Sequence, residues 1–268
     1  MTKITFMCNT HNEENRMPRV IENALLWADE VLIMDCGSTD NTVEVCRQYP
    51  SVRIIENATR YEYVEGVSAS SNDWVYIATP SEMPTRKLIE QVKIMADGDY
   101  DLVTVPRRMY MLGINSPNSP WYVSNYKYLI NRTRTDISHR AHRIFTAKNN
   151  KEGNIHYSED CCVYHLTYTD CQHWLDTMQD YWKIEAREST NLDNDIRACI
   201  DAIKRYDRRL AEGGDELLLL RIAWTLYHMG QSLFLEEKRR GMDVIDVYKH
   251  IYDKVLTEWN GDEFKVNK

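Results

Sequence analysis

The sequence predicts an α/β protein with a Rossmann-like, mostly parallel sheet and a helical C-terminal region. Over the first hundred residues, short apolar runs alternate with amphipathic segments, which is the strand, helix, strand pattern of a parallel sheet. From about Asp170 onward, apolar residues recur three and four positions apart, as in amphipathic helices. We therefore expect a sheet domain over residues 1–169 and a helical region over residues 170–268.

Each expected element follows from a local pattern. Compact apolar runs predict strands at Ile4–Cys8, Glu30–Asp35, Val52–Ile55, Trp74–Ala78 and Asp101–Pro106. Helical spacing predicts helices at Met17–Ala28, Thr42–Tyr49 and Thr85–Met95, and Ser38, Thr39 and Asp40 are natural caps for the second. The aromatic and polar stretch Tyr110–Tyr128 is expected to be a long substrate-facing loop. Further helices are predicted at Trp174–Arg187, Asp193–Leu210, Glu216–Leu235 and Val244–Trp259.

Composition restricts the classes of function. The chain has 268 residues, with 33 Lys and Arg against 41 Asp and Glu, a net charge of −8 and 43% hydrophobic residues. These values are typical of a globular protein and disfavour one whose main partner is a phosphate backbone. We expect no signal peptide, no transmembrane segment, reduced thiols for the seven scattered cysteines, and a cytoplasmic location.

Chemistry is expected at the carboxyl ends of the predicted strands, where open α/β sheets bind ligands. Residues 9–14, 35–40 and 79–82 occupy these positions. The first two segments offer Asn12, Glu14, Asp35 and Asp40 in place of a glycine-rich phosphate loop. Because carboxylates and amides hydrogen bond to ribose hydroxyls and base N–H groups, these loops predict a nucleoside site. Capping and turn stabilisation are the alternative for Asp35 and Asp40.

Several segments carry a family resemblance: ITFMCNTHNEE, DEVLIMDCGSTDNTVEVCRQY, DWVYIATPSEMP, VPRRMYMLG, YKYLINR and VYHLTYTDCQHWLDTMQDYWKIEA. They resemble family 2 glycosyltransferases of the GT-A fold, in particular the lipopolysaccharide-core β-glucosyltransferase-like branch. The resemblance implies an inverting transferase that moves a hexose from a nucleotide-diphosphate sugar, with UDP expected, to a hydroxyl acceptor, with a saccharide expected. It implies that Asn12, Glu14 and Asp35 contact the nucleoside, with Asp40 supporting the loop. We predict that the nucleotide site also includes Thr10, Thr79, Ser81, Arg107 and Arg143.

The first departure from the family pattern concerns the divalent cation, Mn²⁺ or Mg²⁺, that an Asp-x-Asp pair normally holds against the diphosphate. Here Thr79-Pro80-Ser81 replaces that pair, and only the following acid, Glu82, remains. The resemblance places Glu82 and His165 at the metal or diphosphate, although His165 could instead fill a core position. A hard cation needs several oxygen ligands, so metal dependence is in doubt. The alternative source of positive charge is a basic cluster, which could equally be a solvated face: Arg107, Arg108, Lys127, Arg132, Arg140 and Arg143.

The second departure concerns the catalytic base. The family's His-Glu pair corresponds to His142-Arg143, and an arginine does not accept a proton at neutral pH. The nearest acids are Glu159 and Asp160, whose order is similar to the Glu-Asp motif of other family 2 enzymes. We predict Asp160 as the base, with Glu159 beside it; an ordinary solvated loop acid is the alternative.

Two other classes of function compete with this prediction. Loss of both the metal pair and the expected base would suit a non-catalytic binding or scaffold protein of the same fold. A transferase acting on modified nucleic-acid bases or on a protein would use the basic cluster for its acceptor, although the acidic net charge disfavours nucleic acid. A zinc site built from Cys161, Cys162, His165, Cys171 and His173 is disfavoured, because their spacing fits no ordinary finger or ribbon.

Overall fold

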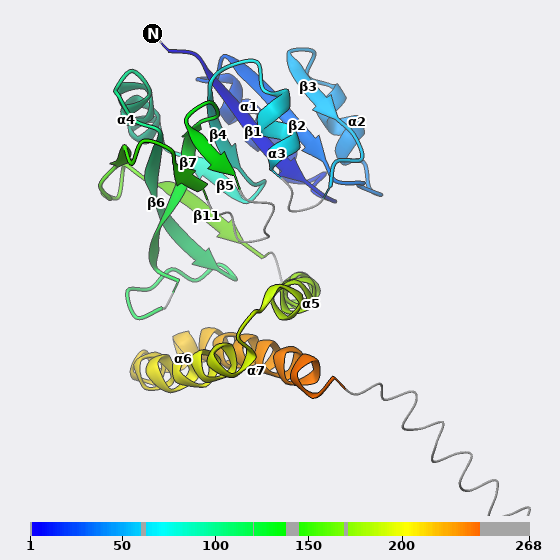
Figure 1. The fold of residues 1–268 in the computed structure, drawn as a ribbon, viewed down its shortest axis with the longest axis vertical. Coiled ribbons are helices and arrows are strands. Elements are labelled where there is room, and N and C mark those ends of the chain that lie inside the picture. Colours follow the sequence, from blue (N-terminus) through cyan, green and yellow to red (C-terminus); the bar gives the residue numbers. More distant parts are fainter. Residues whose placement is uncertain (1, 60–62, 120, 138–144, 169–170, 242–268) are drawn as a thin grey trace, which may run out of the picture.

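A computed structural model describes residues 2–59, 63–119, 121–137, 145–168 and 171–241 (Figure 1). Its main sheet contains β1 (Ile4–Thr10), β2 (Glu30–Asp35), β3 (Val52–Ile55), β4 (Trp74–Ala78), β5 (Glu82–Pro84), β6 (Leu102–Met111), β7 (Val123–Asn131), β10 (Glu152–Asn154) and β11 (Val163–Thr167). The order is β3-β2-β1-β4-β7-β6-β11-β5, with β10 paired to β6. Only β7 and β5 pair antiparallel with their neighbours in this sheet. A separate pair is formed by β8 (Thr135–Ile137) and β9 (Phe145–Ala147).

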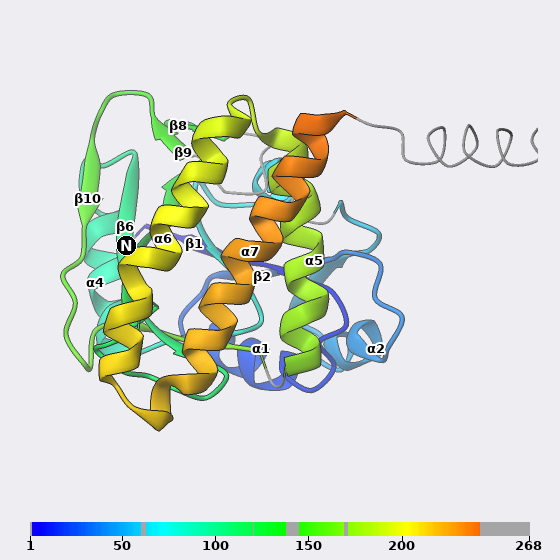
Figure 2. The ribbon, with the colours of Figure 1, turned by 90° about the horizontal axis from the view of Figure 1, so that it is seen from below.

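Helices cover both faces of the sheet and form a layer below it. The sheet is flanked by α1 (Met17–Leu25), α2 (Thr42–Arg47), α3 (Val64–Ala69) and α4 (Arg86–Ala96). The lower layer contains α5 (Cys171–Glu188), α6 (Leu192–Glu212), a short 3-10 helix (Asp215–Leu217) and α7 (Leu218–Arg240). Figure 2 shows these three long helices side by side beneath the strands. None of the helices in the described ranges is long and apolar enough to cross a membrane.

The central strands are apolar on both faces because helices cover both. Phe6 and Ile33 lie in one core cluster with residues of α1 and α4, while Met7 and Leu32 lie in a second cluster with Val67 of α3. Strands buried on both sides read as continuous apolar runs, which explains why their sequence signal was strong.

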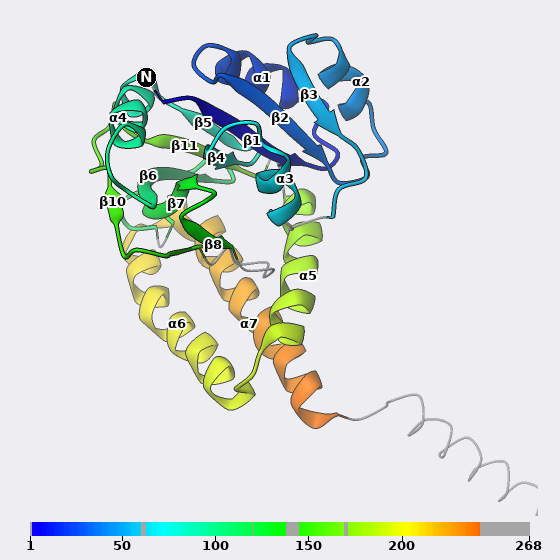
Figure 3. The ribbon, with the colours of Figure 1, turned by 45° about the horizontal axis from the view of Figure 1, so that its top comes forward.

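Parallel pairing brings the ends of three strands to one edge of the sheet. Thr10 of β1 is in register with Asp35 of β2, and Cys8 of β1 is in register with Ala78 of β4. Figure 3 shows β1, β2 and β4 running in the same direction, with α5 beyond their ends. The polar segments that follow these strands therefore meet above α5.

The predicted α/β fold with a curled, mostly parallel sheet and C-terminal helices is correct, and the strands at Glu30–Asp35, Val52–Ile55 and Trp74–Ala78 have the predicted bounds. The predicted loop Tyr110–Tyr128 is wrong at both ends, because β6 continues to Met111 and β7 begins at Val123. Its residues pair with β6, a contact that local composition does not reveal. The predicted helix Val244–Trp259 lies outside the described residues, and the division into domains at residue 169 stays a prediction.

Candidate active site

A cavity of about 470 Å³ lies between the carboxyl ends of the strands and the helical layer. From the sheet it is lined by residues that follow β1 and β4 and by side chains of β6 and β11: Thr10, His11, Glu13, Arg16, Thr79, Pro80, Ser81, Glu82, Arg107 and His165. The opposite wall is aromatic and polar and includes Trp121, Tyr168, His173, Trp174, Thr177, Tyr181 and Tyr227. The cavity thus lies at the edge of the sheet where the sequence predicted ligand chemistry.

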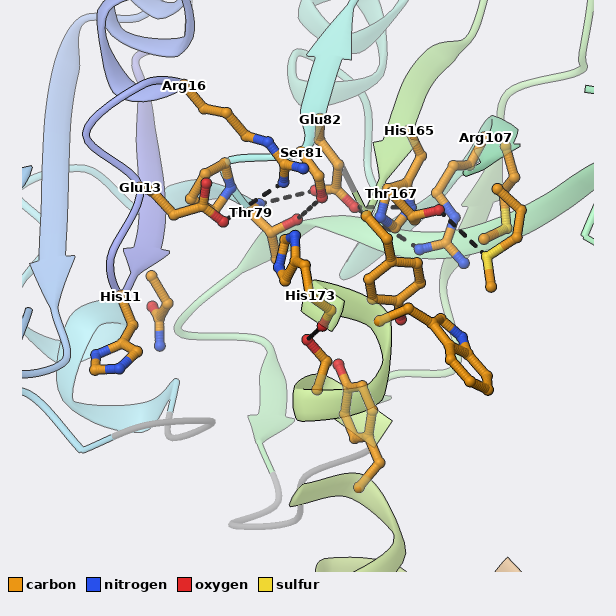
Figure 4. Close-up of a pocket in the computed structure, with 18 of the residues that line it drawn as sticks. His11, Glu13, Arg16, Thr79, Ser81, Glu82, Arg107, His165, Thr167 and His173 are labelled. Carbon is orange, nitrogen blue, oxygen red and sulfur yellow. Dashed lines mark hydrogen bonds and ion pairs between the residues drawn. The ribbon is translucent and has the colours of Figure 1, made fainter. Parts of the chain in front are cut away.

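Glu82 is the most deeply buried acid of the cavity, with 2% of its side chain exposed. Its Oε1 accepts a hydrogen bond from the Tyr128 hydroxyl, and its Oε2 accepts one from the Thr79 N–H at 2.9 Å. Arg107 Nη1 lies 3.7 Å from Oε1, and His165 Nδ1 lies 3.6 Å from the same oxygen. Figure 4 shows Glu82 with Thr79 on one side and His165 and Arg107 on the other. A buried carboxylate with such partners is electrostatically satisfied by the protein itself.

The Glu82 site does not fit a divalent cation. Both carboxylate oxygens already accept hydrogen bonds, and a cation on Oε1 would lie beside the guanidinium of Arg107, where like charges repel. The neighbouring hydroxyls of Thr79 and Ser81 lie 3.1 Å apart, hydrogen bonded to each other, and Pro80 offers no side-chain ligand. Within the described residues, no group of three or more His, Cys, Asp or Glu side chains is arranged to hold a metal ion.

Arg107 is held rigidly in the cavity wall. Its Nε donates to Ser124 Oγ at 3.0 Å, its Nη1 donates to the Tyr128 hydroxyl at 3.5 Å, and its guanidinium lies 4.6 Å from the centre of the Tyr126 ring. Burial alone would lower the pKa of Arg107, but the nearby Tyr128 and Glu82 raise it, so the side chain stays positively charged. Arg107 therefore presents a fixed cation to the cavity.

Glu13 and Arg16 form a second charged pair, in the loop after β1. Arg16 Nη1 lies 3.5 Å from Glu13 Oε1, and less than one fifth of each side chain is exposed. Burial raises the pKa of Glu13, because desolvation outweighs the attraction of Arg16. Sequence reasoning missed both residues as cavity residues, although they belong to or follow the polar segment 9–14.

The predicted nucleoside residues join the two loops to each other. Asn12 Oδ1 accepts from the Thr39 N–H at 2.7 Å, and Glu14 Oε2 accepts from the Asn41 N–H at 3.0 Å. We call these contacts between residues 12–14 and 38–42 the loop clasp; Glu13 N–H adds to it by donating to Thr42 Oγ1 at 2.7 Å. The side chains of Asn12 and Glu14 are not among those that line the cavity.

Asp35 and Asp40 support the turn after β2. Asp35 is 3% exposed, and its carboxylate accepts hydrogen bonds from the N–H groups of Gly37 and Ser38, at 3.2 Å each to Oδ2. Gly37 has a φ of +74°, a backbone conformation that glycine adopts without strain. Asp40 accepts from the Thr42 N–H at 3.0 Å and the Glu14 N–H at 3.2 Å. These contacts are the turn-stabilising alternative of the sequence analysis, and nucleoside binding by Asp35 stays a prediction.

Asp160 and Glu159 lie in the exposed segment before β11 and do not line the cavity. Asp160 pairs with Lys87 of α4, with Nζ 2.9 Å from Oδ2, and accepts from Ser158 Oγ at 2.7 Å. The hydrogen bonds from Ser158 and Lys87 lower the pKa of Asp160. The role of Asp160 as base therefore stays a prediction that this position does not explain.

The basic cluster separates into two environments. Two of its four described members pair with surface acids: Lys127 with Glu152 at 2.8 Å and Arg132 with Asp73 at 3.4 Å. Arg108, by contrast, donates to Asn115 Oδ1 at 2.8 Å. Only Arg107, of those described, lines the cavity, while Arg140 and Arg143 lie outside the described residues. The contacts of Lys127 and Arg132 match the solvated-face alternative, and those of Arg107 do not, so phosphate binding by the cluster stays a prediction.

The family model described as glycosyl transferase family 2 matches residues 7–155, which is more than half of the chain. An uncharacterized glycosyltransferase of Rickettsia typhi is 30% identical over 95 residues, covering 35% of this chain and 32% of that protein. The chain therefore spans about a third of the length of the curated relative it matches.

Two solved structures give weak similarities. Glucosyl-3-phosphoglycerate synthase from Mycobacterium tuberculosis, solved with Mn²⁺, UDP-glucose and phosphoglyceric acid, is 20% identical, with 40% of this chain and 44% of that chain covered and a TM-score of 0.33. A structure described as a mycobacterial protein is 14% identical, with 69% and 74% covered and a TM-score of 0.42. The family match rests on residues 7–155, which contain the end of β1, all of β2 to β10 and most of the sheet side of the cavity. The chain belongs to glycosyl transferase family 2.

Proposed function

We propose that this protein is an inverting glycosyltransferase that moves a hexose from a UDP-sugar to a hydroxyl group of a saccharide. The observation that carries the proposal is the cavity at the carboxyl ends of β1 and β4, where guanidinium, hydroxyl and imidazole groups converge in a family 2 chain. These groups donate hydrogen bonds to phosphate and sugar oxygens. We also propose that the protein belongs to the lipopolysaccharide-core β-glucosyltransferase-like branch and is cytoplasmic. Both of these proposals rest on the sequence.

The two walls of the cavity suit the two substrates. His11 and Cys36, which follow β1 and β2, offer polar groups to a nucleoside, with Asp35 fixing the turn beside them. The hydroxyls of Thr79 and Ser81 follow β4 and lie beside the position we assign to the diphosphate. Trp121, Tyr168 and Tyr181 on the opposite wall offer aromatic faces on which a sugar ring can stack. The acceptor therefore enters from the helical side.

Transfer requires a base for the acceptor hydroxyl. Asp160 is the base that the sequence predicts, and Glu13 is the cavity carboxyl whose pKa is raised by burial, as suits a general base. Comparing Asp160→Asn with Glu13→Gln tests which carboxyl acts, because loss of a general base lowers kcat by about 10²- to 10⁴-fold. The Asp160 side chain is 66% exposed, so we expect its variant to fold, and unchanged kcat in Asp160→Asn would contradict its predicted role.

One observation favours the non-catalytic alternative: the carboxylate predicted as the base pairs with Lys87 and lies outside the cavity. A binding or scaffold protein would keep nucleotide affinity and lack turnover. A transferase acting on modified bases or on a protein would require a different acceptor but the same donor site.

The experiment separates these functions in two steps. Thermal shift with UDP, GDP, CDP, ADP and dTDP identifies the nucleotide, because a ligand that binds only the folded state raises the Tm. Release of UDP from UDP-glucose, UDP-galactose and UDP-N-acetylglucosamine, with and without saccharide acceptors, then tests catalysis. A shift with UDP together with acceptor-stimulated release supports the proposal; a shift without release supports the scaffold. No shift with any nucleotide would contradict a nucleotide-sugar donor.

A further inference from the structure

Two arginines lie on the two sides of the turn that replaces the family's metal-binding pair. Arg16 follows β1 and Arg107 is part of β6, and both line the cavity together with Thr79, Ser81 and Glu82. Figure 4 shows Arg16 reaching towards Ser81, with Arg107 on the other side of Glu82 and His165. The side chains are 19% and 14% exposed, so both guanidinium groups are largely shielded from water. Charges in such a setting act more strongly than on the surface.

In each guanidinium, some N–H groups contact other side chains of the protein and others do not. Arg107 uses Nε and Nη1 for Ser124, Tyr128 and Glu82, and Arg16 uses Nη1 for Glu13. Among the described residues, Nη2 of neither arginine has a hydrogen-bond partner. An arginine whose position is fixed by some N–H groups presents the others without a further cost of ordering. These remaining donors suit the oxygens of a phosphate group.

The turn formed by residues 79–82 does not offer the oxygen ligands that a divalent cation needs. Glu82 is its only carboxylate, and that carboxylate accepts hydrogen bonds from Tyr128 and Thr79 beside Arg107. The family's chemistry nevertheless requires positive charge where the leaving diphosphate develops negative charge. In this chain the arginines can supply that charge.

We propose that Arg16 and Arg107 bind the diphosphate of the donor nucleotide directly, in place of a divalent cation. The inference rests on the proposed function and adds the means by which the leaving group is stabilised. The acceptor oxygen forms a bond to the anomeric carbon as the bond from that carbon to the β-phosphate oxygen breaks. The electron pair of the broken bond stays on the phosphate oxygen, which accepts hydrogen bonds from the guanidinium groups. The acceptor proton passes to the catalytic carboxylate.

The hydroxyls of Thr79 and Ser81 complete this site. They lie 3.1 Å apart, hydrogen bonded to each other, and line the cavity between the two arginines, so the hydroxyl that accepts in this bond can donate its own hydrogen to a phosphate oxygen. Glu82 acts as a positioning residue: it is 2% exposed, and its carboxylate lies 3.7 Å from Arg107 Nη1 and 3.6 Å from His165 Nδ1. Its negative charge holds Arg107 in the wall.

The test compares UDP with uridine by isothermal titration, in EDTA and in Mn²⁺, for the full chain and two variants. In EDTA, UDP should bind more tightly than uridine, and added Mn²⁺ should leave the UDP affinity unchanged or lower it. Arg16→Met and Arg107→Lys should each weaken UDP by about 10- to 100-fold, the usual loss of a hydrogen bond to a charged group, and leave uridine affinity unchanged. Arg107→Lys keeps a cation beside Glu82, which protects folding. Arg86→Met removes an exposed arginine paired with Glu90 and should change neither affinity.

The outcomes distinguish this inference from the proposed function. UDP binding that appears only with Mn²⁺ would overturn the arginine site and leave the transferase standing. Equal losses for UDP and uridine in both variants would overturn the contact with the diphosphate, since uridine has no phosphate. Absence of binding by both ligands under both conditions would overturn the donor assignment itself. UDP binding in EDTA that depends on both arginines supports the inference.

Discussion

The sheet and the helical layer bury their apolar residues to very different extents. In β2, Leu32, Ile33 and Met34 are fully buried, whereas Ile222 and Leu233 of α7 are 48% and 67% exposed. The strands are covered by helices on both faces, while the helical layer packs its apolar residues mainly on the side towards the sheet and between its helices. The candidate site lies where the two regions meet, so a rigid sheet edge carries the charged groups and a less tightly packed helix layer carries the aromatic wall.

The largest expected effect contrasts one leucine from each region. Leu32→Ala should lower the free energy of unfolding by about 2–5 kcal/mol, because it leaves a cavity in a close-packed core. Leu233→Ala should change it by less than about 0.5 kcal/mol, since most of that side chain already contacts water. Urea unfolding of both variants measures the difference. A cost for Leu233→Ala close to that of Leu32→Ala would show that the outer face of α7 is covered in solution.

A second prediction concerns the contact between α5 and α7. A Cβ added at Gly230 would lie 2.4 Å from ring atoms of Trp182, so the two helices would have to separate. Overpacking costs about 1–3 kcal/mol, which exceeds the gain of about 1 kcal/mol from replacing a helical glycine by alanine. Gly230→Ala should therefore lower the Tm. Combining it with Trp182→Leu should recover part of the loss, and additive effects in this cycle would argue against the close contact.

A smaller effect is expected where α4 begins. The Thr85 hydroxyl accepts from the Leu88 N–H at 3.3 Å and donates to the Asp160 carbonyl at 2.8 Å, so it caps α4 and ties it to the segment before β11. Thr85→Ala should cost about 1 kcal/mol, and Thr85→Ser, which keeps the hydroxyl, should cost much less. Equal stabilities of the two variants in thermal unfolding would rule out a capping role.

The smallest expected effect depends on pH and concerns the loop clasp. Burial alone would raise the pKa of Asp40, but hydrogen bonds from Thr42 and from the Glu14 N–H lower it below its usual 3.8. A depressed pKa stabilises the folded state above pH 3.8, and that stability is lost as the pH falls through the folded-state pKa. Asp40→Asn should therefore lower the free energy of unfolding at pH 7 by less than about 1 kcal/mol, because Asp40 is only partly shielded, and so lower the Tm slightly. The difference from the unmodified protein should shrink below pH 3.8, and a difference that grows there would contradict this assignment.

The sequence predicted the parts of the fold whose cause is local. β2, β3 and β4 were correct because burial produces uninterrupted apolar runs of the right length. β5 and β10 have three residues each and contain polar or small residues, so they exist only through pairing with distant strands. Local patterns carry no information about such pairing.

The candidate site was predictable in its location and not in its contacts. The edge formed by the ends of β1, β2 and β4 follows from parallel pairing, which the sequence indicated. The contacts of Glu82 with Tyr128, Arg107 and His165 join four strands, and no spacing in the sequence reveals them. Arg16 lies between the first predicted loop and the predicted helix, and this place beside the loop was the one signal that could have identified it.

The loop clasp has a consequence for recognition. Because the tips after β1 and β2 are fastened to each other through Asn12, Glu14 and Asp40, they form one preorganised rim. A ligand that contacts either loop would bind a surface whose conformation is already fixed. Its affinity would then not be reduced by the entropy cost of ordering two independent loops. We therefore expect a ligand whose polar atoms do not match this rim to bind more weakly than one whose polar atoms do.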